Sequence, residues 1–312
     1  MHNISFFIPA YNCAGTIAES VDSIMKTNFN DGDELIITND CSTDNTLAIL
    51  KELQSKYPVI KVVEHKINKG GAAARNTAVE NAKHDLLFCL DSDNILAENS
   101  IAPLVDFMTG QEAEVACFEH LSYFSSSIKL IDETWSFKLG IFTINDMLSG
   151  SISPGASGNY LFTKSSWLKA NGYSEDLGAL DTWSFGFKQL MAGCKMVVMP
   201  GTHYYHRRGH ESYYLRDAWN KRRSVSLRLI KLIINYIDRI HPNDVDYIFS
   251  KKGRYSWFDN LKKKPIRVVE QNEAQMVWSE HELKATFSNK VFSKSKHYQK
   301  RLVQILTNKT RG

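Results

Sequence analysis

The sequence predicts an α/β protein in which a mainly parallel sheet is covered by helices on both faces. Over roughly the first 200 residues, short β-rich apolar runs alternate with segments whose apolar residues recur at helical spacing. Such alternation is typical of parallel strands joined by helices. The chain has 312 residues, enough for a large buried core. No apolar run approaches the roughly 20 residues of a membrane span.

Five strands and four helices are expected in this part of the chain. The strands are predicted at residues 5–8, 34–38, 61–64, 86–90 and 115–118, and the helices at 16–25, 43–56, 72–83 and 100–108. Ser42 or Thr43 is the candidate N-cap of the second helix, and Asn99 or Ser100 of the fourth. Short polar side chains at these positions satisfy the free amides of a helix start.

The chain changes character after residue 210. Isoleucines at positions 230, 233, 234 and 237 form one stripe, which predicts an amphipathic helix over 216–240 that packs on its own protein and is ended by Pro242. After Glu282 there are eight Lys or Arg residues and no acidic residue. We therefore expect two domains, residues 1–210 and a helical, basic C-terminal region over 211–312.

Composition excludes several classes of protein. The five cysteines are scattered singly without a Cys-x-x-Cys pair, which argues against a disulfide framework or a zinc site. The net charge of +4 is modest, and nucleic acid is not an expected partner. The first residues lack the basic and then apolar layout of a secretion signal, so the expected location is cytoplasmic.

Two carboxylates directly follow the apolar run 86–90. Asp91 and Asp93 form one of three Asp-x-Asp triplets, and the triplets at 31–33 and 244–246 have no strand before them. Ligands of open α/β sheets bind at the carboxyl ends of the strands. Hard carboxylate oxygens at this edge suit a divalent cation shared with a diphosphate. The competing interpretation is a solvated turn.

The other strand ends carry groups suited to a nucleotide. Tyr11 can stack on a base, Asp40 can accept a hydrogen bond from a base or ribose, and Arg75 can neutralise phosphate. Gly70 and Gly71 form either a tight turn or an anion site at the start of the next helix. The nearby Arg75 favours the anion site.

Together these segments resemble the successive signatures of family 2 glycosyltransferases with the GT-A fold. The segments are Ile8-Pro9-Ala10-Tyr11-Asn12, Asn39-Asp40-Cys41-Ser42-Thr43-Asp44, Asn68-Lys69-Gly70-Gly71 through Ala74-Arg75-Asn76, and Leu90-Asp91-Ser92-Asp93. The likeness covers roughly residues 3–210. Asn39 and Cys41 stand where the family commonly has Asp and Gly, whereas Asp40, the expected partner of uracil, is retained.

The resemblance implies a metal-dependent, inverting transferase of polysaccharide biosynthesis. Its donor would be a nucleotide-diphosphate sugar, most commonly a UDP-sugar, and its acceptor a hydroxyl of a glycan or a lipid-linked molecule. The resemblance places Mn²⁺ or Mg²⁺ on Asp93 with His206, or alternatively His210. The residues implied in nucleotide-sugar binding are Pro9, Ala10, Tyr11, Asn12, Asp40, Lys69, Gly70, Arg75, Asp91, Ser92 and Asp93.

Sugar transfer also needs a base that takes the proton of the acceptor hydroxyl. The resemblance implies Asp181, where the usual Glu-Asp pair reads Leu180-Asp181. Glu175 and Asp176 are the alternative bases. Asp181 could also be the N-cap of a helix over 182–192, a position that would lower its pKa.

Two other functions compete with this one. A sugar-phosphate nucleotidyltransferase would also use a metal and a nucleotide, but the first strand is not followed by a glycine-rich loop with a basic residue. A non-catalytic protein could bind polyanions or membranes through the basic C-terminal region, and that region could equally hold a transferase at the inner face of an anionic membrane. Residues 157–160 and Trp183 are candidate acceptor contacts, since aromatic faces suit sugar rings.

Overall fold

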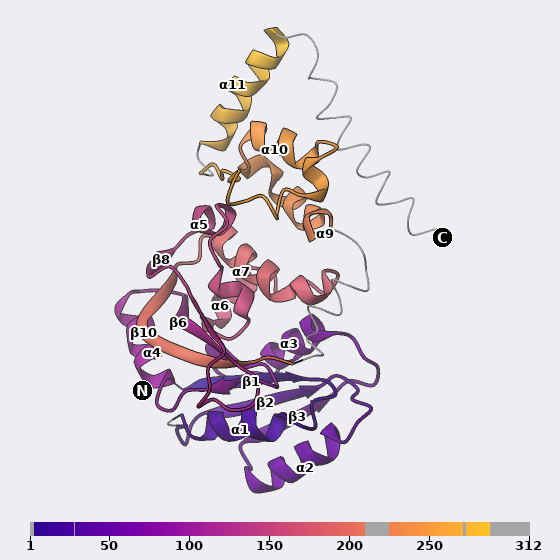
Figure 1. Cartoon of the computed structure of the whole chain (residues 1–312), viewed down its shortest axis with the longest axis vertical. Helices are drawn as coiled ribbons and strands as arrows, with labels where there is room; N and C mark the ends of the chain where they lie inside the picture. The colour runs from indigo at the N-terminus through magenta and orange to yellow at the C-terminus, as the bar shows by residue number, and fades with distance from the viewer. Residues whose placement is uncertain (1–2, 28, 210–224, 271–272, 288–312) are drawn as a thin grey trace.

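The computed structural model describes residues 3–27, 29–209, 225–270 and 273–287. One ten-stranded sheet forms its centre. In Figure 1, helices α1 and α2 lie on one face of the sheet and α3 lies on the other. The C-terminal helices stack beyond α7, at the far end of the long axis.

Strands and helices alternate in the first half of the sheet, as the sequence predicts. The strands are β1 (Ile4–Ala10), β2 (Glu34–Asn39), β3 (Ile60–Glu64) and β4 (Leu86–Cys89), and the helices between them are α1 (Ile17–Met25), α2 (Thr46–Lys56) and α3 (Gly71–Glu80). These strands are parallel, in the order β3-β2-β1-β4. β1 and β2 are buried almost throughout, because helices cover both faces, and this explains their continuous apolar runs.

The second half of the sheet is mixed rather than mainly parallel. Its elements are β5 (Ile95–Leu96), α4 (Ile101–Gly110), β6 (Val115–Phe124), β7 (Glu133–Ser136), β8 (Gly140–Phe142), β9 (Leu161–Thr163) and β10 (Met196–Arg207). β9 lies between β4 and β6 and runs antiparallel to both. β10 is parallel to β6 but antiparallel to β5 and β8. The expectation of a mainly parallel sheet is therefore wrong for this half, because the strand inserted next to β4 enters from the opposite direction.

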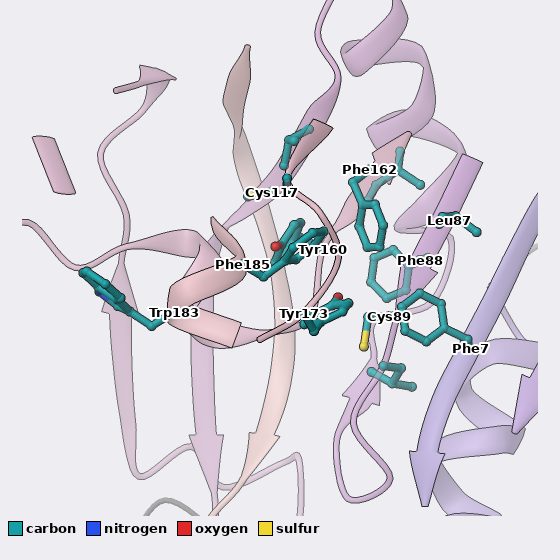
Figure 2. Packing of buried hydrophobic residues seen from close by; sticks show 14 of the residues in the cluster. Phe7, Leu87, Phe88, Cys89, Cys117, Tyr160, Phe162, Tyr173, Trp183 and Phe185 are labelled. Carbon is teal, nitrogen blue, oxygen red and sulfur yellow. The ribbon is translucent and has the colours of Figure 1, made fainter. Parts of the chain in front are cut away.

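Aromatic packing holds the three-residue strand β9 in place and attaches helix α7 (Asp181–Met191) to the sheet. Figure 2 shows Phe7 of β1, Phe88 of β4, Phe162 of β9 and Phe185 of α7 gathered in one cluster. The Phe162 ring centroid lies 6.0 Å from that of Phe7 and 5.2 Å from that of Phe185. Burial of each such ring stabilises the fold by roughly 2–3 kcal/mol. The first residue of α7 is thereby held near the sheet.

Short elements connect β8 to α7. They are α5 (Ile144–Leu148), η1 (Pro154–Ser157), α6 (Lys164–Lys169) and η2 (Gly178–Leu180). Thr143 caps α5 with a capping box, in which its hydroxyl accepts from the Asp146 amide and the Asp146 carboxylate accepts from the Thr143 amide. No helix among residues 3–27, 29–209, 225–270 and 273–287 is long and apolar enough to cross a membrane.

The described part of the C-terminal region is helical, but residues 225–240 do not continue as the single helix expected over 216–240. Its described elements are α9 (Val225–Ile233), η3 (Ile234–Arg239), α10 (Pro242–Phe249), η4 (Gly253–Tyr255) and α11 (Ala274–Phe287). α9 ends at Ile233, and the chain leaves helical geometry at Tyr236. Pro242 is the first residue of α10 rather than the end of a preceding helix, a position where its missing N–H costs nothing.

The C-terminal region packs on α7 and α5. The Trp183 and Phe258 ring centroids lie 5.2 Å apart, and those of Phe187 and Tyr236 lie 5.4 Å apart. The amide of Ile266 donates to the carbonyl of Leu148 at 3.0 Å. The expected boundary at residue 210 and the basic side chains after Glu282 lie outside what the structure describes.

Candidate active site

The strand ends of β1, β2 and β4 meet at one edge of the sheet because these strands are parallel neighbours. Pro9 and Ala10 complete β1, and the loop that follows carries Tyr11, which is 44% exposed, and Asn12. The amide of Asn12 donates to Ser42 Oγ at 3.1 Å, which joins this loop to the loop after β2. The residues expected to bind nucleotide at these two strand ends therefore lie side by side.

Asp40, at the end of β2, is buried and accepts hydrogen bonds from protein groups on both carboxylate oxygens. Oδ1 accepts from the Lys69 amide at 2.8 Å and lies 2.7 Å from His65 Nδ1. Oδ2 accepts from the Gly70 amide at 2.7 Å. In this structure Asp40 thus anchors the loop that enters α3. The hydrogen bond to uracil stays a prediction.

The two glycines of that loop have different reasons to be glycine. Gly70 has φ of +94°, a conformation that other residues rarely adopt. Gly71 is the first residue of α3, and a Cβ there would lie 2.9 Å from Nη1 of Arg75. The missing side chain at 71 leaves room for the Arg75 guanidinium.

Arg75 is buried, and its guanidinium bridges two carboxylates. Nη2 donates to Asp91 Oδ1 and Nη1 donates to Asp181 Oδ2, each at 2.6 Å. The Tyr173 ring centroid lies 5.8 Å from the guanidinium carbon. Both terminal nitrogens therefore contact protein carboxylates in this structure, and the expected contact of Arg75 with phosphate stays a prediction.

Asp91 is paired on its other side by Asn159, a buried residue just after η1. Asn159 Nδ2 donates to Asp91 Oδ2 at 3.0 Å, and Asn159 Oδ1 accepts from the Asp91 amide at 2.7 Å. The carbonyl of Ser92 accepts from Thr16 at 2.9 Å, which ties the triplet to the start of α1. Both oxygens of Asp91 are therefore occupied by protein donors.

Asp93 differs from Asp91 because none of the described residues forms an ion pair with it. The residue is exposed. Desolvation by the surrounding protein, together with the charge of Asp91, nevertheless raises the pKa of Asp93 to about 6, against a weaker opposing effect of Arg207. Such a carboxylate suits a hard divalent cation. Among the described residues there is no cluster of three or more His, Cys, Asp or Glu that could hold a metal ion.

His206 lies on β10 behind this carboxylate pair. Its Nδ1 is 3.1 Å from Nδ2 of Asn94, whose Oδ1 accepts from the Arg207 amide. Burial lowers the pKa of His206. In the neutral ring, a hydrogen bond donated by Asn94 to Nδ1 would place the proton on Nε2. The role of His206 as a metal ligand stays a prediction, and His210 lies outside the described residues.

Asp181 is the first residue of α7 and is buried beside Arg75. Leu180 occupies the N-cap position, so the expectation that Asp181 caps the helix is wrong. Burial raises the pKa of Asp181 against the opposing charge of Arg75, and the negative charge of the half-buried Asp91 raises it further. The expected lowering of its pKa is therefore also corrected. A raised pKa makes the ionised group a stronger base.

The alternative bases lie in different surroundings. Glu175 Oε1 accepts from Asn76 Nδ2 at 3.0 Å. The Asp176 side chain is 64% exposed and lies 3.6 Å from Lys231 Nζ. Neither carboxylate hydrogen-bonds to Arg75, whose two terminal nitrogens are occupied as described above.

The loop that carries Asn159 touches α7 backbone to backbone. A Cβ at Gly155 would lie 2.8 Å from the Cα of Gly186, and a Cβ at Gly186 would lie 2.9 Å from the Cα of Gly155. A Cβ at Gly158 would lie 3.4 Å from Asp91 Oδ2. This loop therefore fills the space between Asp91 and the start of α7. Sequence analysis missed these glycines and the role of Asn159, because no local pattern marks a contact between distant backbones.

The aromatic residues expected to contact an acceptor are buried. Tyr160 is 1% exposed, and its hydroxyl donates to Gln189 at 3.0 Å. Trp183 packs against Phe187 and Phe258, and in Figure 2 it lies apart from the central cluster on the side of α7 that meets the C-terminal region. Neither ring presents a face to a sugar in this structure.

Comparison with known proteins identifies a family. The model described as Glycosyl transferase family 2 matches residues 5–168. Poly-beta-1,6-N-acetyl-D-glucosamine synthase of Staphylococcus epidermidis is 25% identical over 260 residues, which cover 77% of this chain and 62% of that protein. Poly(ribitol-phosphate) beta-glucosyltransferase of Bacillus spizizenii is 32% identical over 114 residues, which cover 36% of this chain and 18% of that protein. The chain spans less than two thirds of the length of either relative.

Solved structures show the same fold. S. aureus TarS 1-349 in complex with UDP superposes with a TM-score of 0.61 and 19% identity, covering 88% of this chain and 77% of that one. The complex with UDP-GlcNAc gives a TM-score of 0.58 and 18% identity, covering 83% and 79%. The likeness confirms the expected GT-A fold, a central sheet flanked by helices.

Proposed function

Because the chain belongs to the family 2 glycosyltransferases, we propose that it moves a sugar, with inversion, from a UDP-sugar to a hydroxyl of a polysaccharide or lipid-linked acceptor. One observation carries this proposal. A single buried guanidinium joins Asp91, beside the exposed Asp93 at the sheet edge, to the buried carboxylate of Asp181. The residues proposed for the donor and for the acceptor proton therefore belong to one connected site.

The donor is proposed to lie over the edge formed by β1, β2 and β4. Tyr11 is exposed there, and Lys69 extends from the loop that Asp40 anchors. The UDP and UDP-GlcNAc complexes of TarS support a uridine nucleotide as the donor of this fold.

A divalent cation is proposed at Asp93. This carboxylate forms no ion pair with a described residue, and Arg207 Nε donates to its main-chain carbonyl at 3.0 Å. Burial and the charge of Asp91 raise its pKa to about 6. Bound Mn²⁺ or Mg²⁺ would supply Lewis-acid stabilisation of the departing nucleotide diphosphate. Asp91, whose oxygens are engaged by Arg75 and Asn159, holds the Asp93 loop in place.

Asp181 is proposed as the base. The acceptor hydroxyl oxygen forms a bond to the anomeric carbon while the bond from that carbon to the diphosphate oxygen breaks. The diphosphate leaves with the electron pair, and the hydroxyl proton passes to Asp181. A single displacement of this kind inverts the anomeric configuration, and a base with a raised pKa accepts the proton more readily.

Association with the inner face of an anionic membrane is proposed for the basic stretch after Glu282. Each Lys or Arg near such a surface contributes about 1 kcal/mol. A chain truncated after Glu282 should bind UDP but no longer cosediment with anionic vesicles. Equal cosedimentation of the truncated and full chains would contradict this role.

The test of the proposed function is UDP release from a panel of UDP-sugars, with Mn²⁺ or with a chelator. One sugar should give Mn²⁺-dependent release. Asp93→Asn should abolish release and weaken UDP binding only when Mn²⁺ is present, as measured by calorimetry. Asp246→Asn is the matched control, because Asp246 is also exposed and also ends an Asp-x-Asp triplet. Equal Mn²⁺-dependent UDP affinity in Asp93→Asn and the parent would exclude the cation site.

A further inference from the structure

We propose that Arg75 is a positioning residue for sugar transfer: it holds the base Asp181 ionised and at a set distance from Asp91. The proposal rests on the proposed function, since it assigns Asp181 as the base. It goes beyond that function because it makes Arg75 a shared cation, which contacts Asp91 on the side of the sugar donor and Asp181 on the side of the acceptor.

The geometry of the guanidinium carries the first step. Nη1 and Nη2 belong to one rigid plane, and each donates at 2.6 Å to a different carboxylate. The side chains of Arg75 and Asp181 are only 9% and 4% exposed. A buried, planar group with both ends engaged sets the separation of the two carboxylates.

The surroundings prevent Arg75 from taking other positions. Nη1 lies against the Cα side of Gly71, where a Cβ would approach it to 2.9 Å. The ring of Tyr173 lies 5.8 Å from the guanidinium carbon. Arg75 Nε is buried without a hydrogen-bond partner among the described residues.

Charge balance carries the second step. Arg75 is one cation between two carboxylates, and Asp93 adds a third carboxylate to the same edge of the sheet. Without Arg75, Asp181 would be a buried acid whose nearest charges are negative. The pKa of such a group is raised further, so it takes up a proton at a higher pH and can then no longer accept one from an acceptor hydroxyl.

The experiment compares Arg75→Met and Arg75→Lys with the parent, using UDP release from the active UDP-sugar in Mn²⁺ as a function of pH. Arg75→Met should lower kcat by about 10²-fold or more at neutral pH and move the acid limb of the kcat profile upward by about one pH unit or more. Arg75→Lys keeps the positive charge but not the two donor nitrogens in one plane. Its kcat and the position of its acid limb should therefore lie between those of Arg75→Met and the parent. UDP affinity in Mn²⁺ should fall by less than kcat does, because Arg75 also holds Asp91 beside the Asp93 loop.

Arg267→Met is the matched control. Arg267 Nε donates to Asp244 at 2.8 Å in the C-terminal region, so this variant also removes an arginine from a buried carboxylate. It should lose stability and keep the parental acid limb. A folded Arg75→Met with the parental acid limb would overturn the proposal. A parent that releases no UDP from any UDP-sugar would overturn the proposed function instead.

Gly71→Ala keeps the proposal testable if Arg75→Met does not fold. Alanine suits this helical position, and its Cβ would displace Nη1 without removing the charge. The acid limb should again move upward. A folded Gly71→Ala with lowered kcat and an unmoved limb would show that Arg75 acts only through packing, and would also overturn the proposal.

Discussion

Asp93→Asn should stabilise the metal-free protein at neutral pH, although it should abolish activity. The pKa of Asp93 is about 6 in the folded chain, against an ordinary value of 3.8. Two units correspond to about 3 kcal/mol for a group shielded from water. Because Asp93 is exposed, solvent screening reduces the effect, and we expect about 1 kcal/mol.

The sign follows from proton binding. A raised folded pKa means that the folded chain binds the proton more tightly than the unfolded chain. The free energy of unfolding of the parent therefore decreases as the pH rises from the ordinary pKa of 3.8 toward the folded-state pKa of about 6. Above that pH the whole decrease remains. Asparagine cannot ionise, so the variant lacks this penalty at neutral pH. The difference in stability should shrink to a small fraction near pH 4, where Asp93 is protonated in the folded chain and about half protonated in the unfolded chain.

The assay is denaturant unfolding of the full chain near pH 4 and near pH 7.5, in chelator and again with Mn²⁺ and UDP. At neutral pH in chelator the variant should be more stable by about 1 kcal/mol, or about 2 °C in Tm. Mn²⁺ with UDP should raise the stability of the parent only, since ligand binding stabilises the folded state. A variant that is less stable than the parent in chelator at neutral pH would refute the reasoning, as would a difference independent of pH.

Three further substitutions test local features. Cys41→Gly should raise the free energy of unfolding by about 0.5–1 kcal/mol, because Cys41 has φ of +59°, and unchanged or lower stability would argue against backbone strain there. Asp40→Asn should lower the free energy of unfolding by about 2 kcal/mol, because it weakens the hydrogen bonds that the Lys69 and Gly70 amides donate to this side chain. Loss of UDP binding at parental stability would point instead to direct contact between Asp40 and the base. Gly150→Ala should lower the free energy of unfolding by about 2 kcal/mol and make the C-terminal region more sensitive to protease. The residue has φ of +84°, and a Cβ there would lie 2.7 Å from the Lys262 amide nitrogen. A variant as resistant to protease as the parent would contradict that packing.

Local patterns predicted the first half of the fold well. β1, β2, β3 and β4 begin and end within about two residues of the predicted bounds, because a continuous apolar run followed by polar residues is a short-range signal. The gathering of Tyr11 and Asp91 at one edge followed from parallel strands alone. The expected family is confirmed by the family model over residues 5–168, and the GT-A fold by the superposed structures.

Long-range pairings could not be predicted in this way. Asp181 follows Arg75 by 106 positions, and nothing near either residue indicates that they form an ion pair. Asp40 is a conventional polar strand-end residue in the sequence, yet tertiary contacts bury it against His65. β9 has three residues, too few to show alternation, and its antiparallel direction depends on aromatic packing with distant partners.

At Gly155 and Gly186 the main chains of the η1 loop and of α7 are in direct contact, so main-chain atoms limit how closely the loop and the helix approach each other. No side chain at either position helps to define the separation between the loop beside Asp91 and the helix that begins with Asp181. Neighbouring side chains can therefore be replaced while the loop and the helix stay in contact at this point. Replacement of either glycine by a larger residue would push the loop and the helix apart. The change would move Asp91 relative to Asp181.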